Sequence, residues 1–387
     1  MKKDDIKHIL KALFDEPLSS KDLLVDREKE IDSLNMVCSL QPAGVYGVCG
    51  ETGVGKTTVL NFVNPDEGER IYLKLTEKES KEIIIADMLY KLAMEVKKSK
   101  ATELSKIAKQ VIDFVVEERS ETSSLGAAGG VFVTGNFSKS TTRTKKFNIY
   151  QTYELFDELL EALLKKYNKV VLLIDELDKE KKEEVLVILD SLKTVFGKNG
   201  LLVILSLPFA IYREYVRDRL RWNESGNLEN ILKDTFFIEP LDDKQIQQMI
   251  SKRLIAYPDY FDGDALYEIA RYSDGNPRDA LWISQQIVQN NLDNERITGQ
   301  IARETIKKIV KRYFGSSWEL TDLQKKVLRI VADHQGSRNA IVKELEKKNV
   351  KRQTAYTYIN RLKEDGLIIE RDEKLRVSGK IFYLISS

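Results

Sequence analysis

The sequence predicts an α/β protein whose first domain contains a doubly wound parallel sheet. Three observations support this class. Short apolar runs alternate with helical patterns over the first 240 residues. One of these runs leads into a glycine-rich loop at residues 50–55. After Pro240 only helical patterns continue, until a mixed pattern begins near residue 318.

The elements of the first domain are expected in regular alternation. Strands are predicted at residues 45–48, 70–75, 169–175 and 200–208. Helices are predicted from Lys56 onward, at 79–119, from about 151 and at 181–197, where apolar residues recur near the helical period. Five consecutive apolar residues precede Asp175, which indicates a strand buried on both faces, as in a parallel sheet.

The remainder of the chain is expected to form two further domains. Amphipathic helices are predicted at 242–254, 262–273 and 277–291, then at 321–334, 338–349 and 351–366. Two short strands are predicted to end the chain, at 367–372 and 380–386. We therefore expect an α/β core over residues 1–240, a helical lid over 241–315 and a winged-helix domain over 316–387.

One segment, residues 120–149, interrupts the helical pattern with glycine, serine and threonine. It is interpreted either as a flexible loop or as a β-hairpin that could touch DNA or a neighbouring subunit. The basic tip of such a hairpin would be formed by Lys139, Arg143, Lys145 and Lys146.

Composition excludes several kinds of protein and site. The 387 residues are 42% hydrophobic and 32% charged, as in ordinary globular proteins. Two cysteines and two histidines cannot build a disulfide framework and make a Cys/His zinc site implausible. Neither a membrane span nor a secretory signal is predicted, so we expect a cytoplasmic protein. The net charge of +1 means that a nucleic-acid surface must be local.

Residues 50–57 read GETGVGKT, a G-x-x-x-x-G-K-T motif between an apolar run and a helical pattern. Glycine accepts the positive φ angles of such a turn and lets backbone N–H groups close around an anion. Lys56 would reach the β- and γ-phosphates, and Thr57 would offer its hydroxyl to Mg²⁺. We predict that the nucleotide contacts Gly50, Glu51, Thr52, Gly53, Val54, Gly55, Lys56, Thr57 and Thr58.

Polar residues stand at the ends of two predicted strands, where open α/β sheets bind ligands. Asp175 is expected to hold Mg²⁺ together with Thr57, and Glu176 to polarise an attacking water. Asp178 is interpreted as local surface charge. Ser206 could hydrogen-bond the water or the γ-phosphate, or it could be an ordinary serine at the end of a strand.

Residues 274–281, DGNPRDAL, predict a turn followed by a helix with proline in its first turn. Arg278 then lies in that first turn. It could reach the phosphates and report their presence, or it could be an exposed arginine at the start of a helix.

Taken in chain order, the loop, LLIDELD, GNPR and a C-terminal winged-helix pattern resemble the initiator branch of the AAA+ ATPases, the origin-recognition and helicase-loader proteins. Signal-transducing STAND ATPases and transposition-regulating ATPases are broader neighbours. The resemblance implies ATP as the nucleotide and an AAA+-like P-loop NTPase core. Segment 120–149 and the long segment 211–235 depart from the family pattern.

The resemblance also implies roles at matching positions. Arg27 would lie near the adenine, Ser206 would act as sensor 1 and Arg278 as sensor 2. A trans-acting arginine finger would fall within YREYVRDRLRWNES. The spacing does not choose among the candidates Arg217, Arg219 and Arg221.

The last seventy residues contain fifteen Lys and Arg against ten Asp and Glu. Ala355, Ile359 and Leu362 recur at the core spacing of a recognition helix, which turns polar residues outward. Such residues can read base edges in a major groove, and lysines can contact phosphate. We predict DNA contacts from Lys351, Arg352, Gln353, Tyr356, Thr357 and Asn360, and from Lys374 and Arg376 on the wing.

The function predicted from the sequence is an ATPase that acts as a switch and binds double-stranded DNA through its winged helix. Nucleotide could drive assembly into a homo-oligomer or with a partner ATPase. A signalling or defence NTPase, or a transposition regulator, whose winged helix contacts protein is the alternative. A metabolic P-loop kinase is disfavoured by Asp175, Glu176 and the lid.

Overall fold

The computed structural model describes residues 3–76, 80–98, 102–127, 148–220, 228–315, 320–371 and 373–385, which form two compact units. One unit, here called the sheet unit, comprises Arg27–Glu239. The other, here called the helical unit, comprises Met1–Asp26 and Pro240–Ser387. The first 26 residues therefore group with the helical part of the chain, although the sequence places them with the α/β core.

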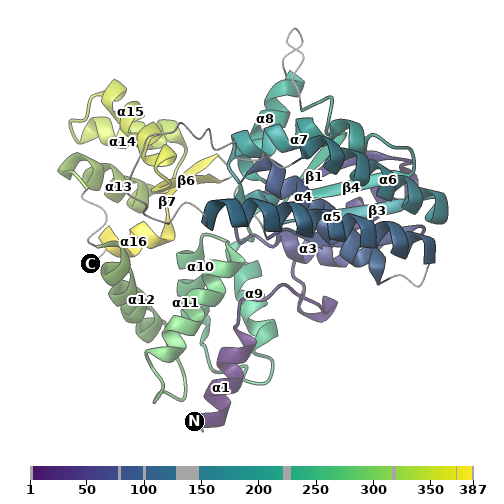
Figure 1. Cartoon of the computed structure of the whole chain (residues 1–387). Coiled ribbons are helices and arrows are strands. Elements are labelled where there is room, and N and C mark those ends of the chain that lie inside the picture. Colours follow the sequence, from purple (N-terminus) through teal and green to yellow (C-terminus); the bar gives the residue numbers. More distant parts are fainter. Residues whose placement is uncertain are drawn as a thin grey trace, which may run out of the picture. The chain divides into compact units, whose positions relative to one another are not determined.

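The sheet unit is built on a five-stranded parallel sheet, which confirms the predicted α/β class (Figure 1). The strand order is β2-β3-β4-β1-β5. Every residue of β3 is buried, as the apolar run before Asp175 predicts. The strands are β1 (Gly44–Gly50), β2 (Glu69–Lys74), β3 (Val170–Asp175), β4 (Leu201–Pro208) and β5 (Asp234–Phe237).

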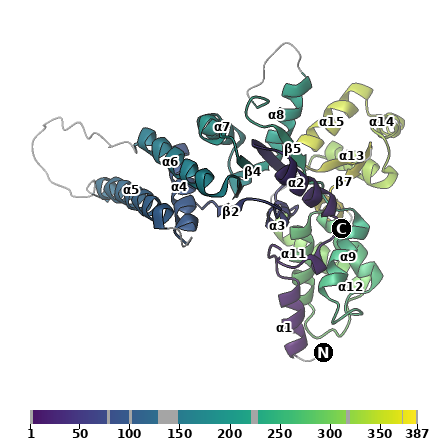
Figure 2. The same ribbon diagram turned by 90° about the vertical axis from the view of Figure 1, so that its right-hand side faces the viewer.

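Helix α2 (Glu28–Leu40) precedes β1, and further helices connect the strands. The connecting helices are α3 (Lys56–Phe62), α4 (Lys81–Lys97), α5 (Thr102–Ala127), α6 (Ile149–Tyr167), α7 (Lys182–Phe196) and α8 (Phe209–Leu220). Helices α4, α5 and α6 pack against one another beside the sheet (Figure 2).

The sequence predicts one helix over residues 79–119, whereas the structure contains α4 and α5 there. Ser80 caps α4 by accepting a hydrogen bond from the backbone N–H of Ile83. The second helix continues to Ala127, into the segment interpreted as a loop or hairpin. The basic residues of the predicted hairpin, Lys139, Arg143, Lys145 and Lys146, lie outside the described residues.

The first part of the helical unit contains α1 (Lys3–Ala12), α9 (Asp243–Arg253), α10 (Gly263–Ser273), α11 (Pro277–Gln289) and α12 (Gly299–Phe314). Ile9 and Leu13 are fully buried in the same apolar cluster as Ile250 and Ile287, which is why the N-terminal segment belongs to this unit. Asp242 and Gln245 form a reciprocal capping box at the start of α9.

The last part of the helical unit contains α13 (Asp322–His334), α14 (Arg338–Lys347), α15 (Arg352–Glu364), β6 (Ile368–Arg371), β7 (Lys374–Val377) and α16 (Gly379–Ile385). Ala355, Ile359 and Leu362 form the buried face of α15, as predicted. β6 and β7 pair as an antiparallel hairpin.

The strand predicted at residues 380–386 is wrong, because this segment forms helix α16. A continuous apolar run does not distinguish a buried strand from a buried helix. Here Tyr383 is buried in the cluster formed by α9–α12, while Ile381 is buried in the cluster formed by α13–α15. The helix therefore joins two apolar cores.

Two further findings concern the chain as a whole. Cys38 and Cys49 are both buried and free, in agreement with the expectation that they build no disulfide framework. Among the described helices, none has both the length and the apolar character that a membrane span requires.

The start of α16 yields a stability prediction. A Cβ atom at Gly379 would lie 1.9 Å from the carbonyl oxygen of Arg271, which is backbone and cannot turn away. We expect Gly379→Ala to lower the free energy of unfolding by about 1–3 kcal/mol, the usual cost of overpacking. Urea denaturation followed by circular dichroism measures the change.

Gly263→Ala is the matched control, because nothing lies within 4 Å of a Cβ at the first residue of α10. This variant should be as stable as the wild type or more stable by up to about 1 kcal/mol. Equal stability of both variants would contradict the close contact between α10 and α16.

Candidate nucleotide-binding site

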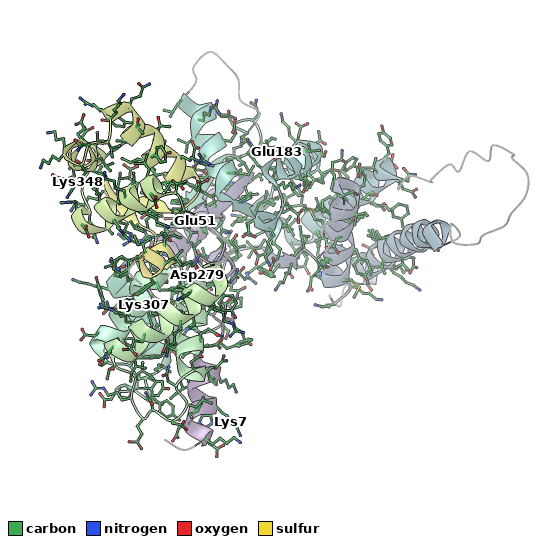
Figure 3. All side chains as sticks on the ribbon, turned by 90° about the vertical axis from the view of Figure 1, so that its left-hand side faces the viewer. Lys7, Glu51, Glu183, Asp279, Lys307 and Lys348 are labelled. Carbon is green, nitrogen blue, oxygen red and sulfur yellow. The ribbon has the colours of Figure 1, made fainter. Side chains whose placement is uncertain are left out.

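The predicted phosphate loop connects the end of β1 to the first turn of α3. Gly53 has a φ angle of 89° and Gly55 one of 104°, values that glycine adopts without strain. Val54 is fully buried and fixes the loop against the core. Glu51, labelled in Figure 3, is an exposed residue of the same loop. The loop therefore has the strand, turn and helix that the motif requires.

Lys56 lies inside this loop, with only 4% of its surface exposed. Its Nζ donates to the carbonyl oxygens of Gly50 at 2.9 Å and Glu51 at 2.8 Å. It also lies 2.8 Å from the Oδ2 of Asp178, whose side chain is 10% exposed. These three acceptors match the three protons of an ammonium group. The cation predicted to reach the phosphates is thus held in place.

Asp175 joins the loop to the end of β3. Its Oδ2 accepts hydrogen bonds from the Thr57 hydroxyl at 2.7 Å and the Tyr72 hydroxyl at 2.8 Å. Burial, followed by the charge of Asp175, raises the pKa of Tyr72, so its hydroxyl stays protonated as a donor. The two residues predicted to hold Mg²⁺ are therefore in direct contact.

Glu176 follows in a left-handed backbone conformation, with a φ angle of 78°. Its N–H donates to the Oδ1 of Asp175 at 2.8 Å. Its own carboxylate forms ion pairs with Lys74 at 3.6 Å and with Lys179. The predicted water-activating acid therefore stands beside the predicted metal ligand, with its charge balanced by two lysines.

Ser206 lies within β4, not at its end, because the strand continues to Pro208. It pairs in register with Val48 of β1. Its hydroxyl is completely buried and has no hydrogen-bond partner among the described residues. A buried polar atom without a partner is unusual and is often a position for water or a ligand.

Arg27 hydrogen-bonds to the backbone of the phosphate loop. Its guanidinium donates to the carbonyl oxygens of Val54 at 3.1 Å and Glu239 at 2.8 Å. The side chain is 5% exposed. These contacts fix the loop backbone, and the predicted role near adenine stays a prediction.

These residues fit a nucleotide with Mg²⁺. Thr57 and Asp175 present two oxygen ligands, the type that Mg²⁺ prefers alongside phosphate oxygens. The loop supplies a cation, and the neighbouring strand supplies the unpartnered hydroxyl of Ser206. Thr52 and Thr58, also predicted to contact nucleotide, belong to the same loop and first turn.

Arg278, the predicted sensor, lies in the helical unit at the start of α11. Its Nε donates to the Oδ2 of Asp15 at 2.8 Å, and its side chain is 48% exposed. Two candidate arginine fingers lie on α8. Arg219 donates to the hydroxyl of Tyr215 and Arg217 is exposed, whereas Arg221 lies outside the described residues.

The residues predicted to contact DNA lie on α15 and β7. Lys351, Arg352 and Gln353 are exposed at the start of α15. Farther along, polar contacts hold the side chains in place. The Tyr356 hydroxyl donates to Asn339, Thr357 donates to the carbonyl of Gln353, and Asn360 accepts from Arg338.

The two predicted residues of β7 differ in exposure. Lys374 is exposed, and Arg376 is 26% exposed. The guanidinium of Arg376 lies 3.8 Å from carboxylate oxygens of both Asp243 and Asp274. The structure therefore places Arg376 between β7 and the acids of α9 and the α10–α11 turn.

Sequence reasoning missed two residues of the site. Asp178, interpreted as surface charge, is nearly buried against Lys56. The spacing of three residues after Asp175 could have indicated it, since the 3₁₀ turn η3 (Leu177–Lys179) directs the chain back. Tyr72 gave no signal, because its contact depends on β2 lying beside β3.

Comparisons with known proteins agree with this geometry. The family model of the KAP family P-loop domain matches residues 27–268. No curated protein matches the chain by sequence. The chain resembles a Walker-type ATPase of Pyrococcus abyssi at 15% identity, covering 97% of this chain and 99% of the other, with a TM-score of 0.50.

Two other solved structures are more distant. The ORC1 protein of Aeropyrum pernix, solved in complex with DNA, has 14% identity, coverage of 98% and 96%, and a TM-score of 0.46. The RuvB Holliday junction branch migration motor of Thermotoga maritima has 14% identity, coverage of 97% and 98%, and a TM-score of 0.43.

The pair formed by Lys56 and Asp178 yields a prediction. Asp178→Asn removes a carboxylate that competes with phosphate for Lys56 and repels it, so ATP affinity should rise several-fold, by about 1 kcal/mol. Lys56→Ala removes the cation itself and should abolish binding. Isothermal calorimetry with ATP and Mg²⁺ measures both.

An unchanged affinity in Lys56→Ala would contradict the assignment of the loop. Weaker binding in Asp178→Asn would show instead that Asp178 positions Lys56 productively for the nucleotide.

Proposed function

Because this chain belongs to the KAP family of P-loop NTPases, we propose that it binds ATP with Mg²⁺, hydrolyses it slowly and acts as a switch on double-stranded DNA. The contact of Thr57 with Asp175 at 2.7 Å carries the nucleotide part of this proposal. It brings together the hydroxyl and the carboxylate that a P-loop enzyme uses to hold Mg²⁺. The fold shared with a Walker-type ATPase supports ATP as the nucleotide.

Hydrolysis is assigned to the residues around Asp175. Lys56 would neutralise charge on the β- and γ-phosphates, and Thr57 and Asp175 would hold a Mg²⁺ ion that supplies further charge neutralisation there. Glu176 accepts the proton of a water whose oxygen attacks the γ-phosphorus, and the phosphoryl group leaves ADP. The buried hydroxyl of Ser206 is available to orient the water or the phosphate.

The ion pairs of Glu176 with Lys74 and Lys179 set its resting position. The carboxylate must leave these ion pairs before it can contact and orient an attacking water. We infer that these contacts keep turnover slow until the carboxylate is released. Slow turnover suits a switch, whose output depends on which nucleotide is bound.

DNA is proposed as the partner of the C-terminal domain. Three helices, α13–α15, followed by the β6–β7 hairpin have the element order of a winged helix. Lys351, Arg352 and Gln353 are exposed where a recognition helix begins. Lys348, in the turn before α15, also points outward (Figure 3). Basic residues exceed acidic ones in this part of the chain.

Glu176→Gln tests the catalytic part. The amide keeps the shape of the side chain but cannot accept the proton, so hydrolysis should fall by a factor of about 10²–10⁴ with little change in ATP affinity. Phosphate release measures turnover and calorimetry measures affinity. Glu183→Gln, at an exposed acid on α7 (76% exposed), is the control and should hydrolyse ATP normally. If Glu176→Gln hydrolyses ATP at the wild-type rate, a residue other than Glu176 accepts the proton of the water.

Arg352→Ala tests the DNA part. The full chain should bind random-sequence duplex with a log–log salt slope of about −0.9 per neutralised phosphate. Loss of Arg352 should cost about 1–3 kcal/mol on a preferred site and less on random DNA. Fluorescence anisotropy measures both.

Arg296→Ala, at an exposed arginine between α11 and α12, is the matched control. It should bind DNA as the wild type does. If the wild type does not bind DNA at low salt, DNA is not the partner of the C-terminal domain, and a protein partner becomes the favoured alternative.

A further inference from the structure

A cavity of about 450 Å³ lies between the start of α9 and the β6–β7 hairpin, within the helical unit. Its wall contains more basic than acidic side chains. The wall residues used in the argument below are Lys244, Arg371, Lys374, Arg376, Asp243 and Gln335. We propose that this cavity binds a phosphate group of a nucleic-acid backbone, an inference that rests on the proposed DNA binding of the C-terminal domain.

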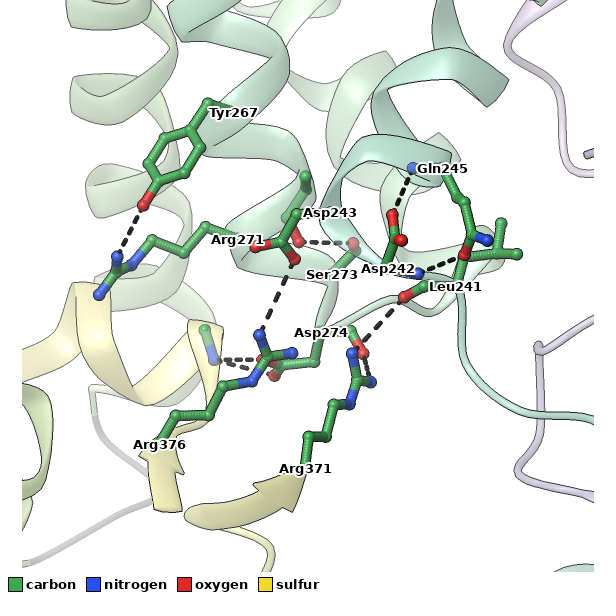
Figure 4. A network of polar contacts seen from close by, with 12 residues as sticks. Leu241, Asp242, Asp243, Gln245, Tyr267, Arg271, Ser273, Asp274, Arg371 and Arg376 are labelled. Atoms are coloured by element: carbon green, nitrogen blue, oxygen red, sulfur yellow. Dashed lines mark hydrogen bonds and ion pairs between the residues drawn. The ribbon is translucent and has the colours of Figure 1, made fainter. Parts of the chain in front are cut away.

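Arg376 lies beside Asp243 and Asp274 (Figure 4), and its described neighbours leave some of its hydrogen-bond donors unused. Its Nε and Nη2 are buried and have no hydrogen-bond partner among the described residues. Its distances of 3.8 Å to Asp243 and Asp274 exceed hydrogen-bond length. A guanidinium with free donors on one edge matches two oxygens of a phosphate.

Arg371 is held rigidly at the same cavity. Its guanidinium donates to the carbonyl oxygens of Leu241 and Asp274 (Figure 4). These bonds hold the guanidinium at the wall of the cavity. A cation fixed beforehand binds an anion with less loss of side-chain entropy.

Lys244 and Lys374 add two mobile cations. Both side chains are exposed, and within the described part of the chain neither ammonium has a hydrogen bond or ion pair. Of the two acids at the cavity, Asp242 is committed to capping α9 through the N–H of Gln245 at 2.7 Å. With Asp274 beside Arg376 counted as well, the four basic residues of the wall still exceed the three acidic ones, and the cavity favours an anion.

The cavity is connected to the exposed face of α15, which favours a polymer over a small free anion. Gln335 lines the cavity, and two residues later Ser337 pairs with Lys374 of β7. The next residue, Arg338, donates to Asn360 and lies 5.2 Å from the ring centroid of Tyr356, both on α15. A duplex contacting α15 can thus extend along residues 335–338 to the cavity.

Lys244→Ala in the full chain tests this proposal, because Lys244 lies on α9, outside the predicted recognition helix and wing. Duplex DNA should bind about five to ten times more weakly at 0.1 M salt, with the salt slope reduced by about 0.9, the loss of one phosphate contact. Anisotropy titrations at several salt concentrations measure both quantities.

Lys308→Ala, at an exposed lysine of α12 away from the cavity wall, is the control and should match the wild type. If wild type binds DNA and Lys244→Ala binds it equally well, the cavity site is wrong while the proposed function stands. If the wild type does not bind DNA, the proposed function is wrong, and the phosphate group bound by the cavity cannot come from DNA.

Inorganic tripolyphosphate distinguishes a free anion from the nucleic-acid backbone. The titration uses Lys56→Ala protein, in which the phosphate loop is inactive, with and without Lys244→Ala. Tripolyphosphate should bind far more weakly than duplex DNA does. If tripolyphosphate binds as tightly as DNA and this binding is lost in the double variant, the cavity binds a free phosphate ligand and the proposed contact with a nucleic-acid backbone is wrong.

Discussion

The hydrogen bond from the Thr57 hydroxyl to Asp175, 2.7 Å long, is the contact on which the candidate catalytic site depends. It connects α3, the helix that follows β1, to the end of β3, although β4 lies between β1 and β3 in the sheet. The same carboxylate accepts Tyr72 and the backbone N–H of Glu176. One buried side chain, that of Asp175, therefore holds the Thr57 hydroxyl, the Tyr72 hydroxyl and the backbone of Glu176, the proposed base.

Asp274 has a comparable place in the helical unit. It accepts hydrogen bonds from the Ser378 hydroxyl at 2.9 Å and the Gly379 N–H at 2.8 Å. Burial raises its pKa, while these bonds and Arg376 oppose that effect. Asp274 lies in the turn that leads into Arg278, so the predicted sensor and the C-terminal domain are attached to the same turn. A movement of that turn would be passed directly to the domain proposed to bind DNA.

Much of the site could be predicted from sequence because local patterns determine it. The glycine spacing fixed the loop, and the apolar run before Asp175 located the buried strand and the two acids. Asp178 was missed because its contact with Lys56 depends on the left-handed backbone at Glu176. The helix at residues 379–385 was missed because its apolar run fits strand and helix equally. The place of α1 depends on tertiary burial of Ile9, which no local pattern reveals.

The central claim is that nucleotide bound at the phosphate loop controls the affinity for DNA. The most direct measurement is the duplex affinity of full-length Glu176→Gln protein with ATP and Mg²⁺, compared with ADP and Mg²⁺. In this variant the ATP state persists through the titration. The account predicts that the two dissociation constants differ by about fivefold or more, the range typical of allosteric coupling. Equal dissociation constants in the two nucleotide states would contradict it.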